Sequence, residues 1–277
     1  MSEKYNKILT VQDLSCVGQC SLTVALPILS AFGAETCVLP TALLSEHTMF
    51  KNFTFLDLAQ NMVATAESWE KDGHRFAAVY TGYLGDKKHF RIVGDIIDAL
   101  TDGDAAVIVD PVFGDNGKLY PLFDEEYVAE VRSFIRKSDI ILPNITEACF
   151  LTGVEYKTVY GKEYIEKLVG ALADLGDFDV VLTGVEKDGL IGFAHYDAAT
   201  KGTEYYFSEK LPQSYHGTGD IFASVFTGAY LSGSSLYDSA KAAAQFVSLA
   251  IAATDEGHDY GVQFEKVLAP FAAKFIG

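Results

Sequence analysis

The sequence has few cysteines and no long apolar run. Its four cysteines (Cys16, Cys20, Cys37 and Cys149) do not have the spacing of a zinc site. No apolar stretch reaches the length of a membrane span, and no charged-then-apolar leader precedes the first predicted strand. These absences favour a reduced, soluble, cytoplasmic protein.

Basic residues are also scarce. The chain carries 21 Lys and Arg against 38 Asp and Glu, a net charge of −17. An acidic surface repels nucleic acids and anionic membranes, so we expect neither as a partner. A local cluster of backbone amides can still bind an anionic small substrate. Apolar residues make up 49% of 277, enough for a substantial core, and no linker or repeat interrupts them. We therefore predict a single domain, residues 1–277.

Strand-like and helix-like segments alternate along the chain. Strands are predicted at residues 8–11, 35–39, 76–80, 105–109, 139–142 and 180–182. Helices are predicted at residues 20–32, 55–71, 87–100, 124–136 and 163–175. Residues 190–207 alternate like two strands with Gly202 at a hairpin turn, and the chain after Asp220 is mostly helical. The alternation predicts an α/β fold whose mostly parallel sheet has helices on both faces.

A glycine-rich turn at Gly217, Thr218 and Gly219 leads directly into an apolar helix beginning near Asp220. Glycine lets a ligand approach the backbone closely, and the free amides of a first helical turn bind anions. A carboxylate beside such amides suits phosphoryl transfer, because the amides hold the phosphate while Asp220 accepts the proton of the attacking hydroxyl. The alternative is a tight turn in which Asp220 only caps the helix.

Polar or glycine residues recur at the carboxyl ends of the predicted strands. They are Asp13, Thr81 with Gly82 and Tyr83, Asp110, Asn144 with Glu147, and Thr183 with Gly184. Open α/β sheets bind ligands at this edge, so we expect one site there.

Two acidic motifs at this edge have alternative interpretations. Asp110 and Asp115 lie on a proline turn after a buried strand, where they could hold Mg²⁺ through water or remain solvated. Asn144 and Glu147 lie three residues apart at the start of a predicted helix. They could coordinate a metal and phosphates indirectly, or form a capping box in which Asn144 is the cap. Both interpretations of the second pair can hold together.

Three ring-bearing residues are further candidates. His47, in a loop, could bind a small ring or be ordinary surface. Tyr83 could stack on an aromatic substrate or belong to the core. His216, directly before the glycine turn, could close over the substrate or nucleotide, or only fill the loop.

With these residues in place, the chain resembles the ribokinase superfamily, and within it the vitamin B6 kinase and hydroxymethylpyrimidine kinase branch. The resemblance covers nearly the whole chain. Gly217 to Asp220 match the anion-hole and catalytic-base motif, and residues 44–48 resemble the substrate loop. Residues 81–83 and 110–115, and Asn144 with Glu147, match as well. The resemblance implies a ribokinase-like three-layer α/β/α sandwich.

The resemblance also implies a reaction, namely ATP-dependent phosphorylation of the 5′-hydroxymethyl group of pyridoxal, pyridoxine or pyridoxamine. Asp220 would act as base, with Gly217, Thr218 and Gly219 as anion hole. By the same resemblance, the substrate ring would be bound by Asp13, His47, Thr48 and Tyr83. The nucleotide would be bound by Asp110, Asn144, Thr183, Gly184 and His216. Glu147 and Asp110 would hold Mg²⁺ through water.

Several further properties follow from the same resemblance. It implies a monovalent cation such as K⁺, a lid at residues 114–120 and a homodimer. The alternatives are a hydroxymethylpyrimidine (phosphate) kinase of thiamin synthesis, a sugar kinase, and a non-catalytic ligand-binding relative that kept the fold.

Overall fold

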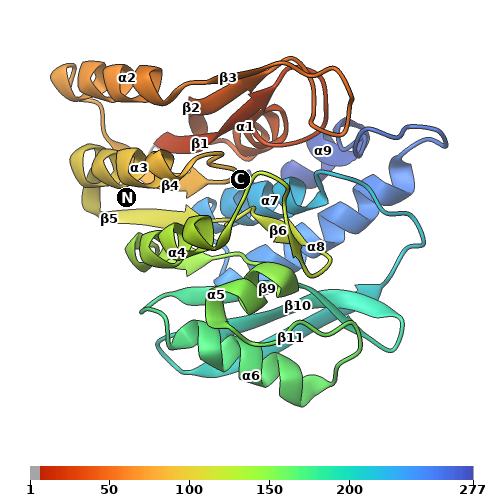
Figure 1. The fold of residues 1–277 in the computed structure, drawn as a ribbon. Coiled ribbons are helices and arrows are strands. Elements are labelled where there is room, and N and C mark those ends of the chain that lie inside the picture. The colour runs from red at the N-terminus through yellow and green to blue at the C-terminus, as the bar shows by residue number, and fades with distance from the viewer. Residues whose placement is uncertain (1–6, 277) are drawn as a thin grey trace.

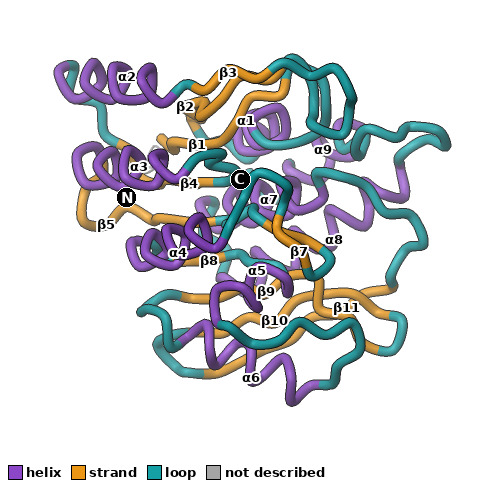
Figure 2. The backbone as a smooth tube through the Cα atoms, viewed as in Figure 1, coloured by secondary structure: helices purple, strands orange, loops and turns teal. Residues whose placement is uncertain are grey.

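The computed structural model describes residues 7–276 and contains a nine-stranded sheet (Figures 1 and 2). The strand order is β11-β10-β9-β8-β5-β4-β1-β2-β3. Neighbours from β9 to β2 run parallel, whereas β10, β11 and β3 are antiparallel at the two sides. The strands are β1 (Lys7–Ser15), β2 (Glu35–Leu44), β3 (Phe55–Asp57), β4 (Phe76–Thr81), β5 (Thr101–Val109), β8 (Ile140–Ile141), β9 (Asp179–Lys187), β10 (Leu190–Asp197) and β11 (Gly202–Glu209).

Helices cover both faces of this sheet (Figure 1). One face carries α2 (Ala59–Lys71), α3 (Lys87–Leu100), α4 (Glu125–Phe134), α5 (Ile145–Thr152) and α6 (Lys162–Ala173). The other carries α1 (Leu22–Ala31), α7 (Thr218–Leu231), α8 (Leu236–Ala253) and α9 (Glu265–Ala272). The predicted three-layer α/β/α sandwich is therefore confirmed.

The strands alternate their side chains between two apolar cores. On β1, Leu9 and Val11 enter the core under α2–α6, while Ile8 enters the core under α1 and α7–α9. Val79 and Tyr80 divide in the same way on β4. Strands buried on both faces have near-continuous apolar sequences, which is why the sequence pattern located them.

The structure corrects the predicted elements near the β3 side of the sheet. β2 continues to Leu44, beyond the predicted strand end at residue 39, and β3 occupies the start of the predicted helix at residues 55–71. Leu43 and Leu56 pair across these strands, so apolar spacing that resembled a helix belongs to a short strand. Asp57 Oδ1 then accepts the Ala59 N–H at 2.9 Å, which begins α2 four residues late.

Two smaller corrections concern turns. Gly202 is the first residue of β11, and the hairpin turn is formed by residues 198–201, where Lys201 takes the left-handed conformation with φ of 55°. The predicted lid segment contains a short hairpin of β6 (Gly114–Asp115) and β7 (Lys118–Leu119). Asp139 and Leu142 fall outside β8, which is limited to two residues.

No helix within residues 7–276 is both long and apolar enough to cross a membrane.

Candidate active site

The glycine turn lies at the N-terminus of α7, as predicted. Gly217 is the N-cap with φ of 79°, and a Cβ atom there would lie 1.9 Å from the Gln19 carbonyl oxygen, so this position requires glycine. At Gly219 an added Cβ atom would meet nothing within 4 Å. The space beside the backbone at Gly219 is therefore open, and the free amides of a first helical turn are the groups that bind an anion. Thr218 opens the helix, and its hydroxyl donates to the Tyr215 carbonyl at 3.4 Å.

Asp220 lies in the first turn of α7 and is half-buried. Burial raises the pKa of its carboxyl to about 7, against a lowering by the Ser21 N–H, and the nearby Asp13 charge raises it further. A base with a pKa near neutrality is suited to accept a proton from a substrate hydroxyl at physiological pH.

Asp13 is buried at the end of β1, close to Asp220. The pairing with β2 becomes irregular between Gln12 and Leu14, so Asp13 stands at a β-bulge, a feature that often re-aims side chains at active sites. The Ser15 hydroxyl donates to Asp13 Oδ2 at 3.0 Å.

Ser21 is a site residue that the sequence reasoning missed. Its N–H interacts with Asp220 and its hydroxyl with Asp13, and both contacts lower the carboxyl pKa values. Its φ of 48° is uncommon for a non-glycine residue, as is often found at functional sites. It was missed because the predicted helix at residues 20–32 includes Ser21, whereas α1 begins at Leu22 and Ser21 is its N-cap residue.

Asp110, directly after β5, and Glu147, in the first turn of α5, form a buried acidic pair. Their relative exposures are 8% and 2%. Burial raises the pKa of Glu147 to about 7, and burial with the charges of Glu147 and Asp220 raises that of Asp110. Within residues 7–276, no cationic side chain is among the main causes of either shift. The pair therefore lies in a strongly negative environment that a divalent cation would neutralise.

The capping-box interpretation of Asn144 and Glu147 is confirmed. Asn144 Oδ1 accepts the Glu147 N–H at 3.0 Å, and Glu147 Oε2 accepts the Asn144 N–H at 2.9 Å. The other oxygen of Glu147 accepts the Phe113 N–H at 2.9 Å, which fixes the turn after Asp110. In this turn Val112 has φ of 42°, a strained conformation for a β-branched residue.

This donor set fits Mg²⁺ held largely through water. Both oxygens of Glu147 already accept backbone hydrogen bonds, so Glu147 would act on a metal through a bound water. Asp110 offers a carboxylate for which Mg²⁺, with its retained waters and substrate phosphates, is a suitable partner. Within residues 7–276 no group of three or more His, Cys, Asp or Glu side chains is arranged to hold a metal by itself.

Thr183 and Gly184 lie beside Asn144. The Thr183 N–H donates to the Pro143 carbonyl at 2.9 Å, and an isolated parallel bridge joins Thr183 to Asn144. Gly184 is the extra residue of a bulge in the pairing of β9 with β10, and its φ of 70° suits glycine. The bulge leaves Gly184 exposed at the edge where the other candidates lie.

His47 and His216, 169 positions apart, lie next to each other. Their ring centroids are 5.4 Å apart. Burial and then the proximity of His216 lower the pKa of His47. His47 Nδ1 accepts the Met49 N–H at 3.1 Å, which orients the ring. Thr48 is exposed in the same loop, and the structure gives it no contact with the other candidates.

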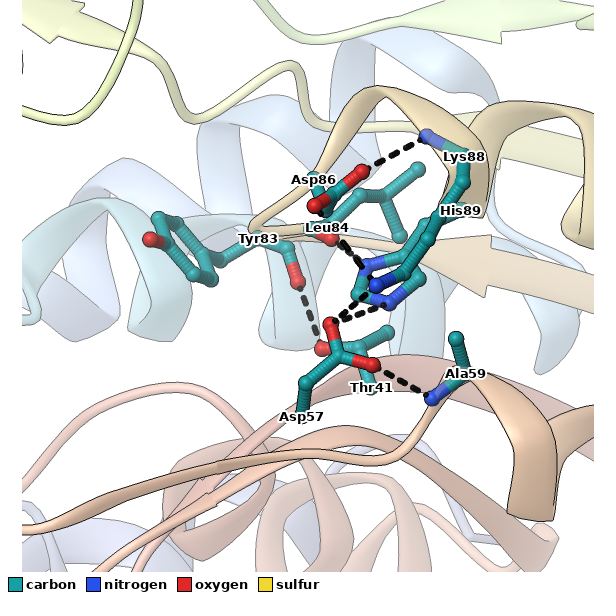
Figure 3. Close-up of polar contacts among 8 residues, drawn as sticks. All are labelled: Thr41, Asp57, Ala59, Tyr83, Leu84, Asp86, Lys88 and His89. Atoms are coloured by element: carbon teal, nitrogen blue, oxygen red, sulfur yellow. Dashed lines mark hydrogen bonds and ion pairs between the residues drawn. The ribbon is translucent and has the colours of Figure 1, made fainter.

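Tyr83 forms part of a wall beside Asp13. Its ring lies 5.5 Å from that of Phe123, and burial together with the Asp13 charge raises its pKa to about 12. Its carbonyl accepts the Thr41 hydroxyl at 3.2 Å, a contact that ties this segment to β2 (Figure 3).

His89, which was not among the predicted site residues, contacts the backbone directly after Tyr83. Its fully buried ring contacts the Leu84 carbonyl oxygen through Nδ1 and lies 3.3 Å from Asp57 Oδ2 through Nε2 (Figure 3). Burial lowers the pKa of His89, whereas the neighbouring Asp57 charge raises it. The Leu84 carbonyl oxygen can only accept a hydrogen bond, so Nδ1 is the donor in that contact. Lys88 Nζ, 3.1 Å from Asp57, completes this polar network.

A cavity of about 690 Å³ lies elsewhere, beside the loop before α6, and is lined by residues such as Lys157, Tyr160 and Lys167. It contains none of the predicted residues. The candidate site is therefore defined by converging polar groups and perturbed pKa values at the sheet edge.

Comparison with known proteins identifies relatives of this chain and of its fold. The family model described as phosphomethylpyrimidine kinase matches residues 26–265. The pyridoxal kinase of Dictyostelium discoideum is 28% identical over 239 residues, covering 80% of this chain and 77% of the relative. The crystal structure of pyridoxal kinase from Lactobacillus plantarum is 32% identical, covers 97% of both chains and has a TM-score of 0.90.

A second solved structure is a Bacteroides thetaiotaomicron protein provisionally described as a phosphomethylpyrimidine kinase. Its crystal form with pyridoxal is 39% identical to this chain, with a TM-score of 0.91. The match covers 97% of this chain and 96% of the other.

Proposed function

The chain belongs to the phosphomethylpyrimidine kinase family of the ribokinase superfamily, and we propose that it is an ATP-dependent kinase of vitamin B6 compounds. It transfers a phosphoryl group to the 5′-hydroxymethyl group of pyridoxal, pyridoxine or pyridoxamine. The observation that carries this proposal is the position of Asp220, whose pKa is about 7, beside the open amide turn of Gly217 and Gly219. The relatives named pyridoxal kinase point to the same substrates.

In the proposed reaction, Asp220 accepts the proton of the substrate hydroxyl. The hydroxyl oxygen then forms a bond to the γ-phosphorus of ATP, the bond to the β–γ bridging oxygen breaks, and ADP leaves with that electron pair. The amides of Gly217, Thr218 and Gly219 stabilise the charge on the transferring group. A base and an anion site on the same helical turn are preorganised for this step.

The nucleotide side of the site comprises Asp110, Asn144, Glu147, Thr183, Gly184 and His216. Asp110 would hold Mg²⁺, with Glu147 acting through water, and the ion would neutralise phosphate charge. The buried acidic pair without a cationic side-chain partner supports this assignment. A monovalent cation such as K⁺ belongs to the same proposal, and omission of K⁺ from the assay tests it.

The substrate side comprises Asp13, His47, Thr48 and Tyr83. The closeness of Asp13 to both Asp220 and Tyr83 supports a common pocket for the reactive hydroxyl and the ring. The adjacent rings of His47 and His216 support a closing element over it.

We also propose that residues 1–277 act as one catalytic domain in the cytoplasm. The strands within residues 7–276 that carry the candidate residues belong to one sheet, which supports a single domain. All four cysteines are unpaired, as expected in a reducing compartment.

The proposed homodimer is supported by an exposed apolar edge, defined here as Leu43, Phe53, Phe55 and Leu56. β3 is an outer strand of the sheet, and the exposed fractions of Phe55 and Leu56 are 46% and 57%. Leu43 and Leu56 are cross-strand partners. An apolar outer strand invites pairing with another chain, and a second copy would cover it.

The direct test is a phosphorylation assay with ATP and Mg²⁺ that compares the three B6 compounds with hydroxymethylpyrimidine. We expect turnover of at least one B6 compound in preference to the pyrimidine. Turnover of the pyrimidine alone would instead assign the protein to thiamin synthesis. Absence of turnover with every substrate, while the substrates still bind, would favour a non-catalytic relative.

A further inference from the structure

Asp13 is a buried carboxylate that has hydroxyl neighbours but lacks a cationic partner among residues 7–276. Only 5% of the residue is exposed, and the β-bulge at the end of β1 sets its direction. The Ser15 hydroxyl donates to one carboxylate oxygen at 3.0 Å, and Ser21 adds a second hydroxyl contact. Two neutral hydroxyls do not replace the hydration of an anion, so a buried carboxylate of this kind calls for a cation.

The surroundings of Asp13 within residues 7–276 supply no such cation. The interactions that shift its pKa are burial, which raises it, and the hydroxyl and backbone hydrogen bonds, which lower it. Its titratable neighbours are Asp220, Cys20 and Tyr83, and the Asp13 charge raises the pKa of each one. The Cys20 thiol and the Tyr83 hydroxyl stay protonated and neutral, and Asp220 is acidic, so none of these three neighbours offers Asp13 a positive charge.

The metal side of the site does not account for Asp13. The pKa of Asp110 is raised by the charges of Glu147 and Asp220. Asp13 is not among the main causes of the pKa shift of either Asp110 or Glu147. Asp13 instead acts on Asp220 from the other side. Asp13 therefore acts on the proposed base rather than on the metal pair, and a hydroxyl-bearing substrate with a positive charge could supply the cation that Asp13 lacks.

We propose that Asp13 determines substrate specificity by pairing with a protonated nitrogen of the substrate. This inference rests on the proposed kinase function and concerns the same site. In B6 compounds the positive charge comes from the protonated ring nitrogen or, in pyridoxamine, from the side-chain ammonium. A charge-assisted hydrogen bond in a dry pocket discriminates strongly, because an uncharged analogue leaves the carboxylate without its partner.

The experiment compares three substrates with the wild-type protein and two variants, Asp13→Asn and Asp13→Ser. The substrates are pyridoxine, pyridoxamine and a pyridoxine analogue with a benzene ring in place of the pyridine ring. Pyridoxine carries only the ring nitrogen, pyridoxamine also carries the ammonium, and the analogue carries neither. The values of kcat/KM and KM are measured for each combination, with thermal melting and ADP affinity as controls for folding.

We expect both variants to lose about 10- to 100-fold in kcat/KM for the nitrogen-bearing substrates, mainly through KM. The benzene analogue should lose less than about threefold, because it has no charge for Asp13 to bind. Loss with both pyridoxine and pyridoxamine identifies the ring nitrogen as the partner, and loss with pyridoxamine alone identifies the ammonium. Equal losses with all three substrates would overturn the proposal.

The wild-type protein supplies a second measurement that needs no variant. It should prefer pyridoxine, pyridoxamine or both to the benzene analogue, by about the factor that the Asp13 variants lose with the same substrate. Equal use of all three substrates would overturn the role of Asp13 and leave the kinase function intact. If neither B6 compound is phosphorylated at all, it is the proposed function that fails.

Discussion

Asn144 and Glu147 hydrogen-bond to each other in both directions, at 3.0 and 2.9 Å, at the start of α5. Glu147 also accepts the Phe113 N–H, so the helix cap holds the turn that follows Asp110. The Asn144 side chain donates in addition to the Gly114 carbonyl at 2.8 Å. The start of α5 and the proposed metal side are consequently one structural unit.

Replacing Asn144 by alanine should therefore affect both stability and nucleotide use. Loss of the cap should lower the free energy of unfolding by about 1 kcal/mol, and the loosened turn should raise the KM for MgATP several-fold. Ser235→Ala is the matched control, because Ser235 caps α8 through the Asp238 N–H at 3.1 Å, outside the site. Denaturant unfolding and steady-state kinetics check both. Equal KM values for the two variants would contradict the link between cap and site.

Asp220→Asn should lower kcat by at least about a hundredfold, the scale of general-base loss, while substrate affinity is retained. In the wild type, kcat should rise with pH through about 7, because Asp220 must be ionised to accept a proton. Asp13→Asn removes a charge that raises the pKa of Asp220, so this acidic limb should move to lower pH. A pH–rate profile of both proteins checks the direction. An acidic limb unaffected by Asp13→Asn would contradict the coupling.

The buried carboxylates predict that Mg²⁺ stabilises the protein in a pH-dependent way. Glu147 and Asp220 have folded pKa values of about 7, above the unfolded values of about 4. The stability they contribute is full below about pH 4 and is lost as the pH rises through about 7. Because Mg²⁺ binds the ionised forms, it should raise the Tm more at about pH 8 than at about pH 5.

Thermal melts with and without Mg²⁺ at the two pH values check this prediction. Asp110→Asn should remove most of the Mg²⁺ effect. Within residues 7–276, backbone N–H groups donate to both carboxylate oxygens of Glu147 but to neither of Asp110, so Asp110 is the member of the proposed metal pair that is free to bind the ion. An equal Mg²⁺ effect in the wild type and Asp110→Asn would place the ion elsewhere.

The contact between His89 and the Leu84 carbonyl predicts a positioning role for His89 (Figure 3). His89→Ala leaves the buried carbonyl without its donor and should cost about 1–3 kcal/mol of stability. It should also raise the KM for B6 compounds more than the KM for ATP, because the released segment carries Tyr83. Steady-state kinetics with each substrate varied in turn check this split.

His195→Phe is the control for a buried histidine. Both ring nitrogens of His195 lack a hydrogen-bond partner within the residues that the structure describes, and burial lowers its pKa. A phenyl ring removes these unsatisfied atoms, so stability should change by less than about 1 kcal/mol and both KM values should stay the same. Similar kinetic effects of the two substitutions would argue against a specific role for His89.

Substitution of the exposed apolar edge should disturb the proposed dimer. Leu56→Glu places a charge on the outer strand and should shift the protein toward monomer, as measured by sedimentation velocity. Val159→Glu is the control, because Val159 is 86% exposed but lies in the loop before α6, away from β3. A dimer that persists in Leu56→Glu, or a wild-type monomer, would contradict the proposed interface.

Several features could be predicted from the sequence because they depend on local order. Apolar runs bounded by polar residues located the parallel strands, since the strands are buried on both faces. The glycine turn before α7 was recognisable because Gly217 and Asp220 lie within one helical turn. The same locality explains the errors, since a three-residue outer strand at β3 has too little periodicity to differ from a helix start.

Other features were decided only by the tertiary structure. The sequence by itself determined the α/β layers and which residues stand at the strand ends. It did not determine which of these ends meet, because that follows from the order of the strands in the sheet. Tertiary packing brings His47 beside His216 and gives both oxygens of Glu147 to backbone amides. It also buries Asp13 with no cationic partner among the residues that the structure describes, because the desolvation of a carboxylate depends on neighbours far away in the chain.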